Sequence, residues 1–310
     1  MRLVWPQGKH FAFSVFDDTD WSTVENTRPV YDLLRDCGFR TTKSCWVRQP
    51  IAGETGKCPG MTTDDPEYLM WLLQLQQEGF EIGLHNVSYA SSTRQQTILG
   101  FEKFQQIFGH PPYSLACHAG VRESVYGGDY RIGGIRRPVY NCLTLFRNAQ
   151  VFDGHVKGTP GFWGDLCKQK VKYVRNFTFR ELNTLRACPL MPYHDPIRPY
   201  VNYWFASTDG HDTRYFINAI REEAQDFLEE TGGACIMYTH FARGFYRDGQ
   251  LNARFVDLIR RLSKKDGWFV PVAQLLDYIG HEQGYHILTE EERRRLEWKW
   301  LWDKIHVGRS

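Results

Sequence analysis

The sequence predicts an α/β protein built on parallel strands, and three observations support this. Short apolar runs alternate with helical patterns along most of the 310 residues. Glycines stand where predicted helices should stop, as Gly38 and Gly79 do. Polar residues of catalytic type follow the ends of several predicted strands, which is where active sites assemble in a β/α barrel.

In the N-terminal part, four predicted strands alternate with three predicted helices. The clearest helix covers 65–79, because Asp65 can cap it, Pro66 suits its first turn and Gly79 ends it. The strands are expected over 10–16, 41–47, 80–84 and 113–117, and the other two helices over 23–37 and 93–108.

The middle of the chain, residues 119–200, is rich in Gly, Pro, Arg and aromatic residues. We expect it to form long loops over one rim of a barrel, with short strand-like pieces at 151–152 and 171–174. Beyond it, strands are expected over 203–207, 234–239 and 268–272, and helices over 212–230 and 251–265.

The tail predicts an amphipathic helix over 288–305. Thr289 and Glu292 have the spacing of a capping box. We expect the helix to pack on the barrel wall, with a dimer contact or a membrane surface as the alternative. The chain is then one barrel domain, 1–280, with an insertion at about 119–200 and a helical extension, 281–310. The expected apolar face consists of Trp298, Leu301, Trp302 and Ile305.

Composition excludes several classes of protein. Thirty-eight Lys and Arg against 36 Asp and Glu give a net charge of +2, which argues against a basic nucleic-acid face. No stretch of ~18 apolar residues exists, so no transmembrane segment is expected. The start lacks the apolar region of a signal peptide. The eight cysteines contain no CxxC pair, so we expect reduced thiols in a cytoplasmic protein. A homo-oligomer is compatible with this sequence.

The candidate chemistry lies at predicted strand ends. Asp17 and Asp18 are adjacent carboxylates after an apolar strand, and two nearby carboxylates ionise together cheaply only with a cation or a donor beside them. A divalent metal ion would meet that need, whereas a solvated acidic turn is the plain alternative. His85, His118 and His240 each follow a further strand, so they are candidates for the same site rather than isolated structural histidines.

Taken in order, these segments resemble the polysaccharide deacetylases, the NodB-homology carbohydrate esterases of family 4. SVFDDT at 14–19 resembles the TFDDG that ends the family's first strand. YLMWLLQLQQEGFEIGLH at 68–85 resembles its helix–glycine–strand–His element, and IMYTH at 236–240 its later strand and His. Order and spacing agree over about 11–280.

The resemblance implies a distorted (β/α)7 barrel with long rim loops, and metal-dependent hydrolysis of an N- or O-acetyl group on a sugar. It implies that Asp17 is the general base and that Asp18 and His85 bind the metal, with Zn²⁺ the expected ion. It further implies that His240 is the general acid, and that Asp209, after YWFAST, orients it.

The sequence departs from the family pattern in two places. The second motif is usually His-x-x-x-His, but here Tyr89 stands at the second position, and Tyr is a poor zinc ligand at neutral pH. His118 is the favoured third ligand, with water, Asn86 or Tyr89 as alternatives. The Arg that pins the base in the third motif is absent, and Arg122 is the candidate substitute.

The expected function is a deacetylase acting on a nucleotide sugar, a lipid-linked intermediate or another surface-glycan precursor. Arg122, Tyr89 and Trp204 are the expected substrate contacts, although core packing is as good a reading for any Trp. The segment 119–200 is the expected substrate-selecting lid. The alternatives are a sugar-binding pseudoenzyme that has lost the metal, and another amide hydrolase, acting on a cyclic ureide or a formyl group.

Overall fold

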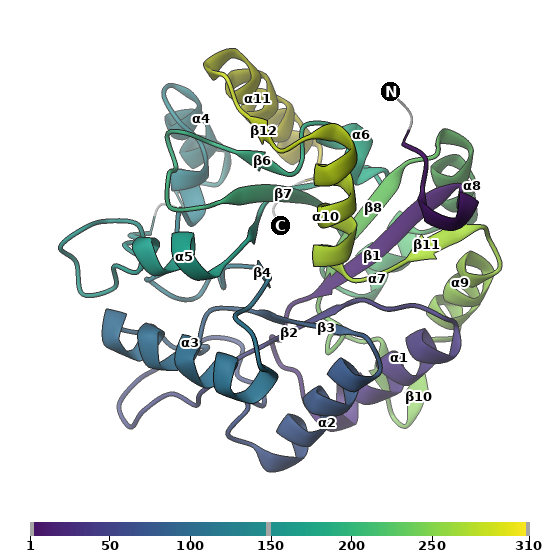
Figure 1. Cartoon of the computed structure of the whole chain (residues 1–310), viewed down its shortest axis with the longest axis horizontal. Helices are drawn as coiled ribbons and strands as arrows, with labels where there is room; N and C mark the ends of the chain where they lie inside the picture. The colour runs from purple at the N-terminus through teal and green to yellow at the C-terminus, as the bar shows by residue number, and fades with distance from the viewer. Residues whose placement is uncertain (1–2, 147–149, 308–310) are drawn as a thin grey trace.

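The computed structural model, which describes residues 3–146 and 150–307, is built around a closed barrel of seven parallel strands (Figure 1). Each strand pairs in parallel with its neighbours, and β8 pairs with both β7 and β1 to close the ring. The predicted α/β barrel is therefore confirmed. Its strands in order are β1 (Phe11–Asp17), β2 (Thr42–Cys45), β3 (Glu81–Leu84), β4 (Ser114–Leu115), β5 (Tyr173–Phe179), β7 (Tyr203–Asp209) and β8 (Ala234–Thr239).

Strand β1 lies at the centre of this arrangement. All seven of its residues are buried, and it pairs with β2, with β8 and with a short outer strand, β11 (Gly267–Phe269). A parallel strand covered on both faces reads as a continuous apolar run, which explains the pattern that predicted it. The same burial means that charged groups at the end of β1 need specific partners.

Helices surround the barrel, and their ends follow the local sequence signals. Thr23 and Thr93 each cap a helix through a capping box, and Gly109 ends α3 with a left-handed φ of 81°. Figure 1 shows α1, α2 and α3 along one side and α8 and α9 along another. The bounds are α1 (Val24–Asp36), α2 (Pro66–Gln77), α3 (Arg94–Phe108), α8 (Glu222–Thr231) and α9 (Ala253–Ser263).

The C-terminal half differs from prediction in three details. The single helix expected over 212–230 is two, α7 (Thr213–Ala219) and α8. A small hairpin of β9 (Tyr246–Arg247) and β10 (Gln250–Leu251) precedes α9. The strand expected over 268–272 ends at Phe269, because Pro271 caps the next helix, α10 (Val272–Gln283), which the sequence pattern did not reveal.

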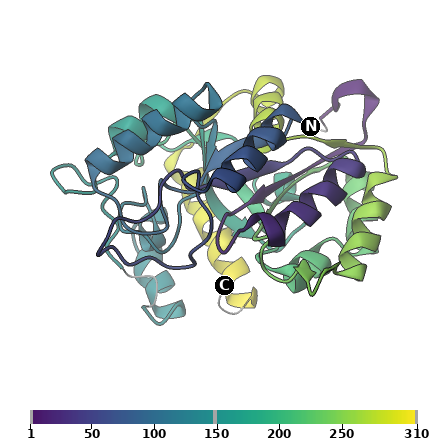
Figure 2. The ribbon, with the colours of Figure 1, turned by 90° about the horizontal axis from the view of Figure 1, so that it is seen from below.

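The loop-rich segment also contains a barrel strand. The strand-like piece expected at 171–174 is the start of β5, which runs on to Phe179. Arg175 and Thr178 hid the rest of this strand, because both are polar side chains that line a cavity inside the barrel mouth. Figure 2 shows the segment gathered on one side of the barrel, away from α9. Its other elements are η2 (Gly128–Arg131), α4 (Arg136–Leu143), α5 (Gly164–Lys170), α6 (Thr184–Ala187) and β6 (Tyr193–His194), which pairs with β7 and with β12 (His286–Ile287).

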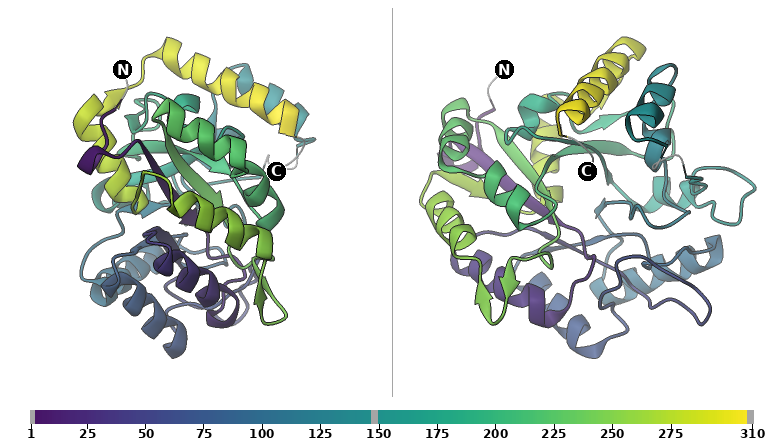
Figure 3. Two further views of the ribbon diagram at one scale, coloured as in Figure 1. Left: turned by 90° about the vertical axis from the view of Figure 1, so that its right-hand side faces the viewer. Right: turned by 180° about the vertical axis from the view of Figure 1, so that it is seen from behind.

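The tail forms α11 (Glu290–Val307), which packs against α4 and β5 (Figure 3). Of the expected apolar face only Leu301 is buried. Trp298, Trp302 and Ile305 are exposed, and Leu296 and Trp300 are buried in their place. Buried ion pairs explain why a different face of α11 points inward. The buried Glu297 side chain forms ion pairs with Arg136 and Arg198. The buried Asp195 side chain forms ion pairs with Arg198 and Arg293. These pairs fix which side of α11 faces inward.

In the part of the chain described, no helix combines the length and the apolar character needed to cross a membrane.

Candidate active site

Polar side chains from four strand ends meet at one mouth of the barrel. Asp18 and Asp20 follow β1, His85 follows β3, His118 follows β4 and His240 follows β8. All five line a cavity of about 540 Å³. They converge because the carboxyl ends of parallel barrel strands open onto the same rim.

Asp20, His85 and His118 form the tightest cluster. Asp20 Oδ2 lies 2.9 Å from His85 Nε2, and Asp20 Oδ1 lies 3.3 Å from His118 Nδ1. The two histidine nitrogens, His118 Nδ1 and His85 Nε2, are 3.2 Å apart. All three side chains are buried. Burial acts to raise the pKa of Asp20, but the neighbouring His85 and His118 hold it well below its ordinary value.

Hydrogen bonds that involve the backbone hold the His85 ring and the His118 main chain in place. His85 Nδ1 donates to the carbonyl oxygen of Ala116 at 2.8 Å, which turns Nε2 toward Asp20. Asn86, with a left-handed φ of 54°, accepts the backbone N–H of His118 at 2.7 Å. A side chain on Gly120 would begin 2.5 Å from His118 Nε2, so glycine is required there. The oxygen of Asn86 therefore positions His118, and Asn86 is not itself a member of the cluster.

The donor set of this cluster fits a divalent metal ion. Ligands ~2.0–2.1 Å from one tetrahedral ion lie ~3.3 Å from each other. The two histidine nitrogens meet this spacing at 3.2 Å, and one oxygen of Asp20 lies within 4.8 Å of both. Asp20 Oδ2 is buried and faces His85 Nε2, at 2.9 Å, so a cation shared between the two atoms would satisfy both. A second group, Asp18, Asp20 and His240, also brings three possible ligand atoms within 4.8 Å of one another.

Asp18 is held by a buried arginine. Arg175 Nη1 and Nη2 donate to the two Asp18 oxygens at 2.8 and 2.6 Å, a bidentate pair. Asp18 is only 2% exposed, and burial would raise its pKa, but Arg175 and His85 hold that pKa below the ordinary value. The carboxylate therefore stays ionised at the cavity wall.

Asp17 lies outside the cavity, on the other side of the strand end. Its Oδ2 lies 2.9 Å from the Lys43 ammonium and accepts from the Tyr31 hydroxyl at 3.1 Å. Its Oδ1 accepts the Phe241 backbone N–H at 2.8 Å. Both members of the Asp17–Lys43 pair are fully buried. Burial raises the pKa of Asp17, and the ammonium beside it opposes that rise. The interactions of Asp17 thus join β1, β2 and the loop after β8.

His240 presents one ring nitrogen to the cavity. Its Nδ1 donates to the His211 carbonyl at 2.7 Å, so Nε2 points inward, 3.4 Å from the Tyr238 hydroxyl and 3.6 Å from Asp20 Oδ2. The Trp21 ring packs edge-on against the His240 ring, with the two ring centres 5.9 Å apart. Burial lowers the pKa of His240, while the carboxylates nearby act in the opposite direction.

Asp209 contacts His211 rather than His240. Its Oδ1 accepts from the ring Nδ1 of His211 at 2.9 Å and from the His211 backbone at 3.2 Å. Any influence on His240 would therefore pass through the His211 carbonyl.

The three residues expected to contact substrate do not line this cavity. The Tyr89 hydroxyl donates to the Gln49 side chain at 2.9 Å. Arg122, mostly exposed, lies 3.0 Å from Asp153 and therefore does not replace the missing family arginine. Trp204 is buried in the core on β7.

Sequence reasoning missed Asp20 and Arg175. Asp20 was available as the third acid of the Asp-Asp-Thr-Asp segment, two residues beyond Asp18. Arg175 is the single charged residue in strand β5, and a buried strand arginine needs an anionic partner.

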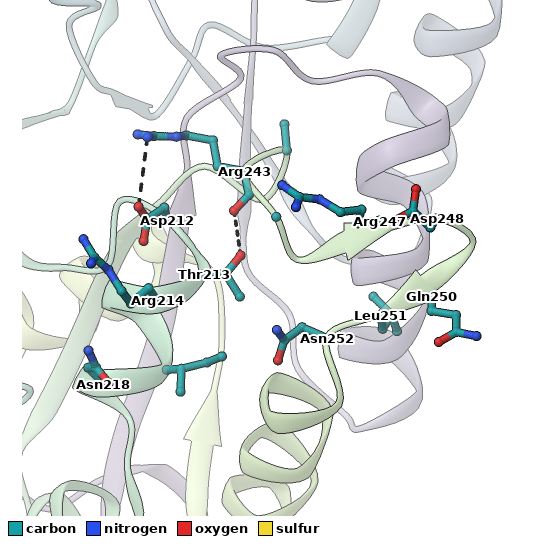
Figure 4. A pocket seen from close by; sticks show the side chains of 13 residues that line it. Asp212, Thr213, Arg214, Asn218, Arg243, Arg247, Asp248, Gln250, Leu251 and Asn252 are labelled. Carbon is teal, nitrogen blue, oxygen red and sulfur yellow. Dashed lines mark hydrogen bonds and ion pairs between the residues drawn. The ribbon is translucent and has the colours of Figure 1, made fainter.

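A second hollow of about 1050 Å³ lies on the surface beside α7 and the β9–β10 hairpin (Figure 4). It is more open and carries no histidine or cysteine. Its border with the first cavity is Arg243, whose Nη2 lies 4.0 Å from Asp212 Oδ2 and whose carbonyl accepts from the Thr213 hydroxyl. The candidate chemistry therefore belongs to the smaller cavity.

No protein-family profile and no curated protein matches the sequence. Solved structures do match the fold. An assigned polysaccharide deacetylase from Mycobacterium smegmatis aligns with a TM-score of 0.52 at 12% identity, covering 93% of this chain and 97% of the other. An assigned polysaccharide deacetylase from Pseudomonas aeruginosa PAO1 aligns with a TM-score of 0.51 at 10% identity, covering 92% and 96%.

The chain has the polysaccharide deacetylase fold. The resemblance seen in the sequence is confirmed at the level of fold, with the sequences themselves far apart. A PuuE allantoinase shares the deacetylase fold to the same degree, with a TM-score of 0.52 at 10% identity over 92% of this chain and 95% of that one.

Proposed function

We propose that this chain is a metal-dependent hydrolase that removes an acetyl group from a sugar. The observation that carries the proposal is the buried Asp20–His85–His118 cluster, beside an ionised Asp18 and an inward-facing His240. His118 supplies the ligand that Tyr89 cannot, which removes the reason to favour a metal-free pseudoenzyme.

Asp20, His85 and His118 would hold the ion, and a bound divalent cation would polarise the acetyl carbonyl and make a water molecule easier to deprotonate. We assign the general base to Asp18 instead of Asp17, because Asp18 faces the cavity and Arg175 keeps it deprotonated. Asp17 has every oxygen engaged in the barrel interior.

His240 is the group that would protonate the leaving nitrogen or oxygen. Because Nδ1–H is committed to the His211 carbonyl, proton exchange with substrate must occur at Nε2. Trp21 covers the same ring and limits the approach of bulk water. Asp209 then acts as a positioning residue, through its hydrogen bonds to His211.

The test measures acetate release by purified protein from N-acetylglucosamine, UDP-N-acetylglucosamine and acetylated chitooligosaccharides, with allantoin and a formylated sugar in the same panel. We expect acetate release that disappears with a chelator and returns with Zn²⁺. Release that is indifferent to chelation would contradict metal dependence, and turnover of allantoin alone would favour the cyclic amide alternative.

A further inference from the structure

Trp21 follows the candidate metal ligand Asp20 in the sequence and lines the same cavity. All ten tryptophans of the chain lie in the described residues, and two of them, Trp21 and Trp300, line this cavity. Trp300 is only 2% exposed, because it packs against Tyr140 and Phe177, whereas Trp21 is 39% exposed. Trp21 is therefore the tryptophan that a ligand in the cavity can reach.

A tight turn places Asp20 and Trp21 together at the mouth of the barrel. The Ser22 N–H closes this turn by donating to the Thr19 carbonyl at 3.0 Å. Trp21 has a left-handed φ of 55°, a conformation that turns normally give to Gly or Asn. A bulky side chain at such a φ is an outlier, and strain of this kind persists where the surrounding structure holds it, as at ligand-binding sites.

The loop before α2 holds this strained turn in place. The Trp21 N–H donates to the Cys58 carbonyl at 3.1 Å, and the Met61 N–H donates to the Ser22 carbonyl at 2.8 Å. Cys58 also has a left-handed φ, of 59°, and also lines the cavity. A side chain on Gly60 would begin 2.9 Å from the Ser22 backbone, so the close approach of the two segments requires glycine. These contacts fix the position of the Trp21 backbone.

Two side chains from the loop after β8 position the Trp21 ring. The His240 ring meets it edge-on, with the ring centres 5.9 Å apart, and the Arg243 guanidinium lies 5.4 Å from its centre. Arg243 also borders the open hollow (Figure 4). A guanidinium over an aromatic ring is a favourable cation–π contact, so Arg243 stabilises this orientation. The indole is thereby held beside the histidine proposed to protonate the leaving group.

An exposed indole in a polar cavity suits the ring of a pyranose sugar. A pyranose ring presents C–H groups on its faces, and an aromatic side chain can cover them without hydrogen bonds. Tyr140, Phe152 and Trp300 also line the cavity, but each is buried. The Tyr238 ring is covered by the Arg175 guanidinium, 4.1 Å from its centre. Trp21 is thus the best placed aromatic surface for a sugar.

We propose that Trp21 is the platform on which the sugar ring of the substrate lies, with the acetyl group directed toward the candidate metal cluster. This inference rests on the proposed function and deepens it. It makes Trp21, and not Trp204, the tryptophan that contacts substrate, and it predicts selection of pyranosides over acetyl compounds without a sugar ring.

The kinetic test compares methyl N-acetyl-β-glucosaminide with N-acetylethanolamine, which has the same amide but no ring. We expect kcat/KM to favour the sugar, and Trp21→Ala to reduce that preference about tenfold, mainly through KM, as for the loss of an aromatic contact. Trp21→Phe keeps an aromatic face and should retain most of the preference. Trp298→Ala is the matched control, because Trp298 is also 39% exposed but does not line the cavity, and it should leave the preference unchanged. Equal losses on both compounds in Trp21→Ala would indicate a purely structural role and overturn the proposal.

A binding test keeps this inference separate from the proposed function. Calorimetry on metal-free protein should show that methyl N-acetyl-β-glucosaminide binds the wild type about tenfold more tightly than Trp21→Ala. Trp21→Leu, which keeps a bulky apolar side chain without an aromatic face, replaces Trp21→Ala if that variant does not fold. If sugar binding depends on Trp21 but no sugar is deacetylated, the platform stands and the proposed function fails. If sugars are deacetylated and neither binding nor preference depends on Trp21, the platform is wrong and the function stands. The absence of both sugar binding and deacetylation would overturn both.

Discussion

Two buried ion pairs at the end of β1 allow the general base to be identified by experiment. Asp18 pairs with Arg175, and Asp17 pairs with Lys43, in both cases within 3 Å and with the carboxylate almost fully buried. Only the Asp18 pair lines the cavity. Removing one cation at a time therefore separates a role in catalysis from a role in folding.

We expect Arg175→Met and Lys43→Met to destabilise the protein by a similar amount. Each leaves a buried carboxylate unpaired, which costs about 3–5 kcal/mol. For 310 residues, this corresponds to a fall of roughly 5 °C or more in Tm. Because Arg175 lowers the pKa of Asp18, the ion pair stabilises the folded protein above pH ~4, the ordinary pKa of Asp. This stabilisation is lost as the pH falls through the lowered pKa of Asp18. The difference between wild type and Arg175→Met should therefore shrink in acid.

The pH dependence of activity should distinguish the two variants. Without Arg175, burial raises the pKa of Asp18, so the acidic limb of kcat/KM should move to higher pH. Lys43→Met should leave that limb in place, because Asp17 does not face the cavity. The assay is acetate release across pH on folded protein, with metal content matched between samples. A limb that moves in Lys43→Met and stays fixed in Arg175→Met would refute the assignment of Asp18.

Three other predictions follow from described contacts. His118→Ala should reduce bound Zn²⁺ at least about tenfold, measured by elemental analysis, since it removes one of three clustered ligands; full retention of the ion would exclude this cluster. Burial raises the pKa of Glu123 to about 8 from 4.5, so the folded protein should lose stability as pH rises between these values, and Glu123→Gln should remove that loss in denaturant titrations. Glu297→Gln should cost about 3 kcal/mol of unfolding free energy, because Arg136 and Arg198 lose a buried partner. The substitution Ile305→Ala, at an exposed position, should change it by less than about 0.5 kcal/mol, and equal effects would contradict the packing of α11.

The barrel could be predicted from the sequence because strands such as β1 and β8 are mostly apolar and its first helices carry strong caps. Thr93 and Gly109, for example, mark the ends of α3. Strand β5 was only partly visible, since Arg175 faces the cavity and breaks the apolar run. The face of α11 was misread, because pattern alone cannot show that Glu297 would be buried by two arginines.

The strand ends that form the site were predicted, and of its two carboxylates Asp18 was predicted but Asp20 was not. His85, His118 and His240 do converge, as their positions after parallel strands indicated. The turn after β1 decides which carboxylate lies beside the histidines. Asp17 points into the barrel interior, toward Lys43, and Asp20 points into the cavity, toward His85. Such a turn leaves no periodic signal, and the arginine that fixes Asp18 is 157 residues away in the chain.

The seam between β3 and β4 gives the histidine cluster a mechanical role. Only one register pair, Leu84 with Leu115, joins these strands along their length. Further hydrogen bonds across the seam join the His85 ring to the Ala116 carbonyl and the His118 backbone N–H to the Asn86 side chain. An ion bound by both histidines would add a further link between β3 and β4, which share a single register pair, so metal binding would also stabilise the barrel at this seam.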